Sequence, residues 1–194
     1  MSINLLETVQ QNLGYPALQK ISPNTQQVVQ GENIAAEDKF SQAAIPAVLP
    51  GLYLYAQSDE GTAAILQNDT PANWLGKIFN ENEEKAVTAV AQYAIQTSGF
   101  TIDKMNAIAN ESVKQVKLHL PAGASANEVR AFFLKQKNTI LLHLLPDLQI
   151  GALLHDNNLD DNTNKMDGGI SGLIQNIGEL FSGSGTTDED NRTN

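Results

Sequence analysis

The sequence predicts an all-α fold, built as a compact multi-helix bundle. Apolar residues recur at helical spacings along most of the chain, helix-start and helix-stop residues separate these segments, and no segment has a convincing strand pattern. The chain has 194 residues, of which 41% are hydrophobic. This length is enough to bury a real core in one domain of ordinary size. We assign residues 1–154 to this helical domain.

Three helices are expected at the start of the chain. Residues 3–13 carry one apolar helical face that stops at a glycine, and residues 22–31 begin with Ser-Pro-Asn-Thr, which is a helix-start signal. Residues 35–58 form the third helix. Pro46 and Pro50 lie inside it, and we expect a kink or a break there because each proline removes an amide donor and crowds the preceding turn.

The middle of the chain is expected to continue as short helices. A turn at residues 59–61 precedes a short helix at 62–67, and the spacing of apolar residues predicts another over 74–79. A longer helix then runs to Gly99. Three acidic residues open it, and we interpret them as charges matched to the positive end of the helix dipole rather than as acid–base catalysts. They are Glu81, Glu83 and Glu84.

Thr101 is expected to cap the next helix, which ends at Leu120. A strand over residues 116–120 is the minority alternative, because Lys117 and His119 alternate with apolar residues there. The helical interpretation is preferred, since the apolar spacing of the preceding residues continues into this segment.

The last helix of the domain is expected to start at the capping box Ser125–Glu128 and to end near Leu145, before a proline. The end of this helix also raises the question of an internal repeat. Residues 143–152 align without gaps with residues 47–56, sharing a Leu-Pro pair and flanking apolar positions. Two architectures stay open: two similar helical halves, or chance agreement between two helices rich in Ala and Leu.

The composition changes at His155. Residues 155–169 read as an acidic loop, residues 170–181 as an amphipathic helix, and residues 182–194 as a disordered tail. The amphipathic helix could cover the core of its own domain, or it could bind a groove of a protein partner or of a second copy. Its apolar positions, called here the C-terminal stripe, are the candidate partner-binding residues Ile170, Leu173, Ile174, Ile177, Leu180 and Phe181.

The formal net charge of −10 is unevenly distributed. Residues 1–154 hold 14 acidic and 10 basic side chains, a net charge of −4, whereas residues 155–194 hold 8 acidic and 2 basic ones, a net charge of −6. Residues 101–145 are a local exception, with six basic against three acidic side chains. This basic stretch is either a solvated helix face or a surface that docks the acidic C-terminal region of the same or another chain.

Composition excludes several classes of function. The acidic balance and the presence of only two arginines argue against nucleic-acid binding. The absence of Cys excludes disulfides, thiol nucleophiles and thiolate metal sites. No apolar run is long enough to cross a bilayer and no secretory signal is visible, so we expect no membrane binding and a cytoplasmic location. No nucleophile, nucleotide or dinucleotide motif is present, and no cofactor is expected.

The acidic loop offers an alternative function, divalent-cation (calcium) binding. Its oxygen-bearing side chains match the ligand positions of a twelve-residue calcium loop, although Asp161 replaces the usual glycine and the closing residue is shorter than the usual Glu. His155 precedes the loop and could join such a site, whereas His143 is expected to be a partly buried helix residue. A solvated linker is the simpler interpretation. The matching residues are Asp156, Asn158, Asp160, Asn162, Asn164 and Asp167.

The region from Phe40 to about Ala152 resembles a known family. The residues that carry the likeness are segments 43–52, 59–66, 74–79, 97–102 and 144–146. They resemble the family of uncharacterised bacterial domains that includes YidB. The resemblance implies an all-helical, soluble bacterial domain, and it brings no catalytic residues to this chain.

Together these observations predict a non-enzymatic helical interaction or assembly module. Its partner is expected to be a protein or a second copy of the chain, contacted through the C-terminal stripe. The alternatives are calcium binding by residues 156–167, or an enzyme of a kind that the sequence does not reveal.

Overall fold

The computed structural model describes residues 3–21, 36–67 and 72–155. Within these residues the chain is helical and contains no strand, which confirms the all-α prediction and makes the strand alternative at 116–120 wrong. The elements in chain order are α1 (Leu5–Asn12), α2 (Ala36–Tyr55), α3 (Asp59–Gln67), α4 (Trp74–Phe79), the 3-10 helix η1 (Asn80–Asn82), α5 (Glu83–Ala94), α6 (Ser98–His119), α7 (Ala126–Leu141), the 3-10 helix η2 (Pro146–Leu148) and α8 (Ile150–Leu153).

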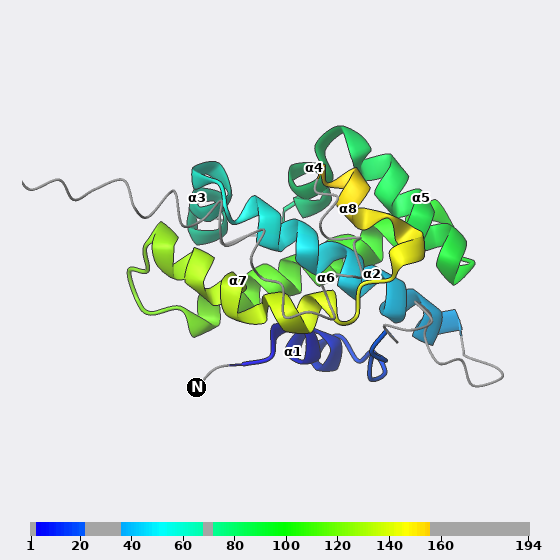
Figure 1. The fold of residues 1–194 in the computed structure, drawn as a ribbon, viewed down its shortest axis with the longest axis horizontal. Coiled ribbons are helices and arrows are strands. Elements are labelled where there is room, and N and C mark those ends of the chain that lie inside the picture. The colour runs from blue at the N-terminus through cyan, green and yellow to red at the C-terminus, as the bar shows by residue number, and fades with distance from the viewer. Residues whose placement is uncertain (1–2, 22–35, 68–71, 156–194) are drawn as a thin grey trace, which may run out of the picture.

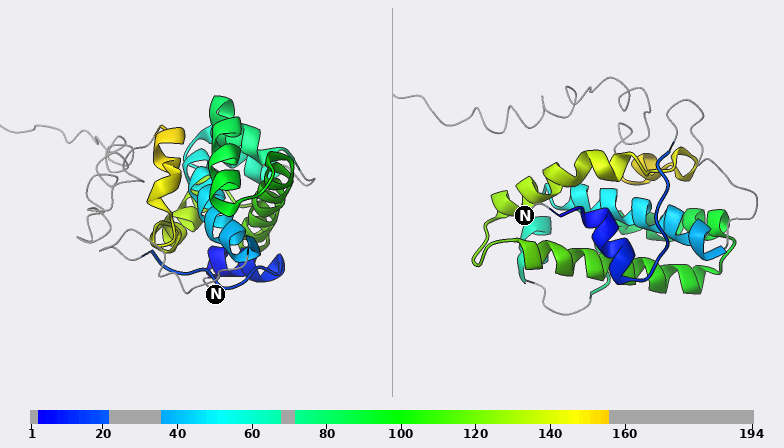
Figure 2. Two further views of the ribbon diagram at one scale, coloured as in Figure 1. Left: turned by 90° about the vertical axis from the view of Figure 1, so that its right-hand side faces the viewer. Right: turned by 90° about the horizontal axis from the view of Figure 1, so that it is seen from below.

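Helix α2 is the centre of the bundle. It packs against α1, α3, α4, α5, α6 and α7, and residues 41–53 are all buried. Figure 2 shows α2 lying between α6 on one side and α7 with α8 on the other. Over residues 43–53 the sequence of α2 is apolar on all sides rather than along one stripe, which is the pattern of a helix segment with no solvent-facing side.

Of the two outcomes expected at Pro46 and Pro50, a kink or a break, the break is wrong. Both prolines lie inside a helix that is continuous from Ala36 to Tyr55. Each still removes one intrahelical hydrogen bond, but α2 is enclosed by other helices on every side, and this packing holds it together. The glycine that follows Pro50 has a separate role. A Cβ at Gly51 would lie 2.1 Å from Cγ2 of Ile78, so only glycine lets α4 approach α2 this closely.

Two helix starts differ from the prediction because a capping side chain lies earlier in the sequence. The expected turn at residues 59–61 is instead the first turn of α3, where the Ser58 hydroxyl accepts a hydrogen bond from the Gly61 amide at 2.9 Å. Helix α6 is capped by Thr97, whose hydroxyl accepts from the Phe100 amide at 3.3 Å. Thr101, the expected cap, is a buried residue inside α6.

Two helix ends also lie earlier than expected. Helix α5 ends at Ala94 rather than Gly99, because Ile95 takes the left-handed conformation that terminates a helix. Helix α7 ends at Leu141 rather than Leu145. Its start is as predicted, since Ser125 and Glu128 form the capping box. The helix predicted over residues 22–31 lies outside the described residues.

The two segments of the suggested repeat have different backbone structures. Residues 47–55 lie inside continuous α2, whereas the aligned region around Pro146 is an irregular segment followed by η2 and α8. A proline therefore produces a corner only in the second segment, where α7 has already ended. The local structure gives no support to two similar halves.

Glutamine side chains hold the N-terminal segment against the bundle. Gln42 of α2 accepts from the backbone amide of Gln19 at 2.7 Å and donates to its carbonyl at 2.8 Å. Gln136 of α7 accepts from the amide of Leu5 at 2.9 Å and donates to the carbonyl of Ile3 at 2.9 Å. Each amide satisfies one backbone donor and one acceptor that no helix supplies. These contacts hold Ile3 and Leu5 against α7 and Gln19 against α2.

Buried residues from α1 to α8 form one hydrophobic cluster, which runs from Leu5 to Ile150. In the part of the chain that the structure describes, no helix has the length and apolar character needed to cross a membrane. Residues 156–169, 170–181 and 182–194, predicted as loop, amphipathic helix and tail, lie outside the described residues.

Candidate functional site

An acidic groove lies between α5 and α6. Its volume is about 510 Å³. Its acidic side comes from η1 and the first turn of α5, and its other side comes from the first turns of α6. The residues that line it are Glu81, Glu83, Glu84, Val87, Thr88, Ser98, Gly99 and Ile102.

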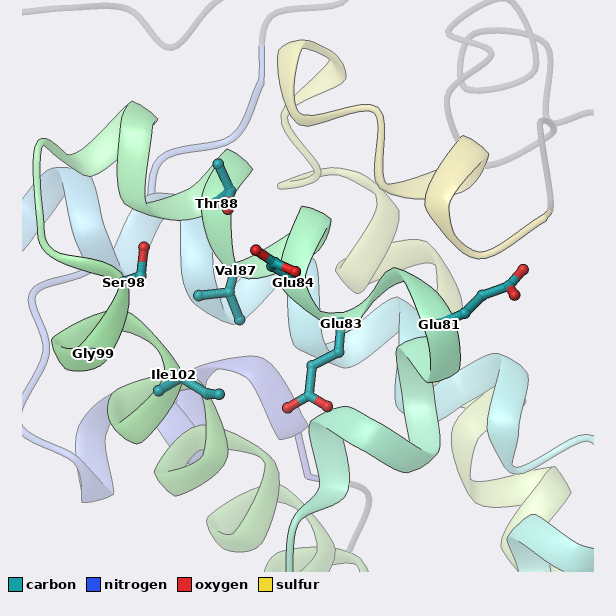
Figure 3. Close-up of a pocket in the computed structure, with 8 residues that line it drawn as sticks. All are labelled: Glu81, Glu83, Glu84, Val87, Thr88, Ser98, Gly99 and Ile102. Atoms are coloured by element: carbon teal, nitrogen blue, oxygen red, sulfur yellow. The ribbon is translucent and has the colours of Figure 1, made fainter.

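The three carboxylates of the acidic groove do not converge. Figure 3 shows that the side chains of Glu81, Glu83 and Glu84 point in different directions, with Glu81 directed away from the groove. Glu83 lies over α4 instead, with Oε2 3.1 Å from the position a Cβ would take at Gly76. A catalytic carboxylate pair or a metal site needs oxygens that share one point in space. This arrangement has no such point.

The position of these acids agrees with their interpretation as helix-start charges. Glu83 and Glu84 occupy the first turn of α5, and Glu81 lies in the preceding η1. Negative charge is stabilising there because the amides of the first helical turn carry the positive end of the dipole. Among the described residues, no group of three or more His, Asp or Glu side chains is arranged to hold a metal ion.

Asn82 fixes the end of the described chain, next to the start of the acidic segment. This side chain is only 5% exposed. Its Nδ2 donates to the carbonyl of Leu153 at 2.9 Å and lies 3.4 Å from Nε2 of His155, while Oδ1 accepts from Nζ of Lys85 at 3.0 Å. His155 Nε2 also lies 3.9 Å from Oε1 of Glu81. The last described residue is therefore held beside the acidic groove.

A second groove lies at the other end of α6 and is called here the α6–α7 groove. It has a volume of about 420 Å³ and is formed by the end of α6, the start of α7 and the N-terminal segment. Its lining mixes apolar and polar side chains. The lining residues are Ile3, His119, Leu120, Pro121, Glu128, Ala131, Phe132, Lys135 and Gln136.

The basic stretch of residues 101–145 is not one uniform solvated face. Arg130 binds the corner between α2 and α3, where its Nε donates to the carbonyl of Gln57 at 3.2 Å and its Nη2 contacts Asp59. Lys137 is buried. Lys114 pairs with Glu111 within α6, and the ammonium of Lys104 lies over the ring of Phe100. Lys135 is exposed and lies in the α6–α7 groove. The cations of this stretch therefore have separate structural roles.

The three histidines lie in three different places. His143 follows α7 rather than lying in it, is 6% exposed, and its Nδ1 is 2.8 Å from the carbonyl of Thr139. Burial lowers its pKa from the usual value, and Lys20 adds to this effect. His119 lies at the end of α6 and lines the α6–α7 groove. The structure does not bring them together into a metal site.

Several predicted site residues lie outside the described residues. They are the C-terminal stripe and the possible calcium ligands at 156–167, and both hypotheses stay predictions. Sequence reasoning missed Asn82 and the α6–α7 groove. No sequence pattern indicates Asn82, because an isolated Asn has no periodicity. None indicates the groove, because it brings Ile3 together with residues more than a hundred positions away.

Comparisons with family models, with curated proteins and with solved structures found no match. The resemblance to the bacterial family that includes YidB stays a prediction.

Proposed function

We propose that this chain is a non-enzymatic helical interaction or assembly module that works in the cytoplasm and self-associates through the C-terminal stripe. The described domain carries two open grooves, and neither assembles converging catalytic groups. A surface that binds protein needs no such convergence, only apolar contact and complementary charge. The stripe supplies six apolar side chains on one helical face.

The observation that carries the proposal is the enclosure of α2. Six helices from the described part of the chain pack on it, and residues 41–53 are buried. The domain thus has one continuous core, built from buried residues that range from Leu5 to Ile150. The stripe is not needed to cover α2, and we therefore assign its apolar side chains to contact with another molecule.

The anchor at Asn82 supports the same function. Asn82 holds the carbonyl of Leu153, two residues before the last described residue. Residues 156–169, predicted from the sequence as a polar loop, separate that residue from the stripe by 14 positions. We expect a linker of this length to present an amphipathic helix to a second molecule.

Sedimentation velocity on three full-length chains tests the proposal. The native chain is compared with a double variant Leu173→Asp, Ile177→Asp, which places two carboxylates within the stripe. A matched control, Gly172→Asp with Gln175→Asp, adds the same charge on the opposite side of the expected helix. We expect the native chain and the control to sediment as an oligomer and the stripe variant to sediment as a monomer, because buried carboxylates without partners are strongly unfavourable.

Equal sedimentation of all three chains as monomers would rule out self-association through the stripe. Equal oligomerisation of all three would assign assembly to another surface. Circular dichroism of each chain shows whether the bundle is intact, so loss of folding is not mistaken for loss of association.

A further inference from the structure

We propose that residues 13–21, called here the strap, stay closed on the bundle near neutral pH and lift from it when His143 takes up a proton. The strap follows α1 and forms no regular secondary structure. Figure 2 shows this blue segment running from α1 past α2 to the end of α7. The inference concerns a conformational switch inside the described domain and is independent of the proposed function.

Hydrogen bonds hold the last residues of the strap. The side chain of Gln42 binds the amide and the carbonyl of Gln19 at 2.7 and 2.8 Å, and the amide of Ile21 donates to the carbonyl of Leu142 at 2.9 Å. Ile21 is 7% exposed, but no residue from 13 to 20 is buried. A segment with so little buried surface can open locally while the helices beneath it stay folded.

His143 lies directly beside the closed end of the strap. It follows Leu142, the residue that accepts the hydrogen bond from Ile21. Its side chain is 6% exposed, and its Nδ1 lies 2.8 Å from the carbonyl of Thr139. A neutral imidazole can donate one N–H to that carbonyl, whereas an imidazolium carries a second N–H and a positive charge that are costly to bury. Protonation therefore favours a conformation that brings the ring into contact with water.

The charges around His143 direct this effect at the strap. The charged groups that face it are Lys20 from the strap and Glu7 from α1, and α7 contributes the neutral carbonyl of Thr139. Burial lowers the pKa of His143 most strongly and Lys20 lowers it further, whereas the carbonyl and Glu7 act in the opposite direction without cancelling the shift. A protonated His143 would repel Lys20, the residue that precedes the strap's hydrogen bond to Leu142.

The sign of the pH dependence follows from this lowered pKa. His143 in the closed form binds a proton less readily than a solvated histidine with a pKa of 6.5. The strap is therefore closed above pH 6.5. Below that pH, the ratio of open to closed molecules rises by up to about tenfold per pH unit, until the pH reaches the lower pKa of the closed form.

Amide hydrogen exchange of the full-length chain, followed residue by residue by NMR, tests the switch. The amides of Gln19 and Ile21 report on the strap because both donate hydrogen bonds that opening breaks. Their protection factors, which are corrected for the intrinsic effect of pH, are expected to fall by up to about tenfold between pH 6.5 and about pH 5.5. We expect no such fall in His143→Gln, because glutamine does not titrate. The amide of Met105, a buried residue of α6, reports on the whole bundle.

Two exposed charges provide a matched pair of variants that leave His143 in place. Lys20→Gln raises the pKa of the closed form toward 6.5, so we expect a smaller loss of protection than in the native chain. Glu7→Gln lowers that pKa further, so we expect the loss to continue to a lower pH. These opposite effects test the switch even if His143→Gln does not fold.

Four results would overturn the inference. Protection of Gln19 and Ile21 that stays constant over this pH range would show that the strap does not open. An equal loss in His143→Gln would assign the opening to another group, and an equal loss at Met105 would show that the proton destabilises the whole bundle. Identical pH profiles for Lys20→Gln and Glu7→Gln would show that neither charge acts on His143.

Discussion

At the scale of single residues, Asn110 connects two segments of the bundle. Its Oδ1 accepts from the amide of Ala72 at 2.9 Å and from Nε1 of Trp74 at 3.0 Å, and its Nδ2 donates to the carbonyls of Ala72 at 3.1 Å and Asn106 at 2.8 Å. One side chain on α6 therefore fixes both the start of α4 and the buried indole of Trp74. Loss of this amide removes the acceptor of two donors, the Ala72 amide and Nε1 of Trp74.

We expect Asn110→Leu to lower the free energy of unfolding by about 2–4 kcal/mol, since a buried donor that loses its acceptor costs about 1–3 kcal/mol. Urea denaturation measures this change. Asn138→Leu makes the same chemical substitution at an exposed position of α7 and is expected to change stability by less than about 0.5 kcal/mol. Equal effects of the two substitutions would show that the hydrogen bonds of Asn110 contribute nothing net.

His143 makes stability depend on pH. Burial lowers its pKa from the ordinary value of 6.5, so the unfolded chain binds a proton at this residue more readily than the folded chain does. Its contribution is therefore fully present above pH 6.5 and is lost as the pH falls toward the lower folded pKa. We expect His143→Gln to flatten the stability curve below pH 6.5 by at most about 1.4 kcal/mol per pH unit. Unchanged slopes in urea unfolding between the two chains would contradict this account.

At the scale of elements, helix interiors were easier to predict from the sequence than helix ends. Apolar spacing identifies α5, α6 and α7, and the Ser125–Glu128 capping box identifies the start of α7 correctly. The apolar spacing predicts ends of α5 and α7 that are several residues too late. The residues that terminate these helices, Ile95 and Leu142, are apolar and so resemble a continuation of the helix. The prolines of α2 predict a kink or a break, and α2 has no break; sequence alone does not show that other helices pack around it.

Helix α5 ends at a residue type that disfavours the backbone conformation found there. It lies at the end of α5 with φ of 56°, a conformation that a β-branched residue adopts only with strain, and its side chain is 79% exposed. We expect Ile95→Gly to raise the free energy of unfolding by about 1 kcal/mol, because glycine adopts this conformation without a Cβ clash.

Thermal unfolding measures this effect as an increase in Tm of about 2–4 °C. Ile95→Ala is the matched control, since it removes the exposed side chain but keeps Cβ. We expect its Tm to increase by less than half of the increase seen for Ile95→Gly. A decrease in Tm for Ile95→Gly would mean that the isoleucine side chain makes stabilising contacts that outweigh the backbone strain.

At the scale of the whole molecule, sequence and structure identify different surface features. Charge counting identified residues 155–194 as an acidic appendage, and helical spacing identified the C-terminal stripe. The α6–α7 groove could not be predicted, because it forms only when Ile3 is brought against the ends of α6 and α7. Gln136 holds that arrangement, and a single buried Gln has no sequence pattern that indicates its partner.

The whole account depends on assembly through the C-terminal region, and the molar mass of the full-length chain as a function of concentration tests this most directly. Light scattering on a dilution series is predicted to show a mass that rises above the chain's 20.9 kDa as the concentration increases, as reversible self-association requires. A mass of 20.9 kDa at every concentration would contradict the account.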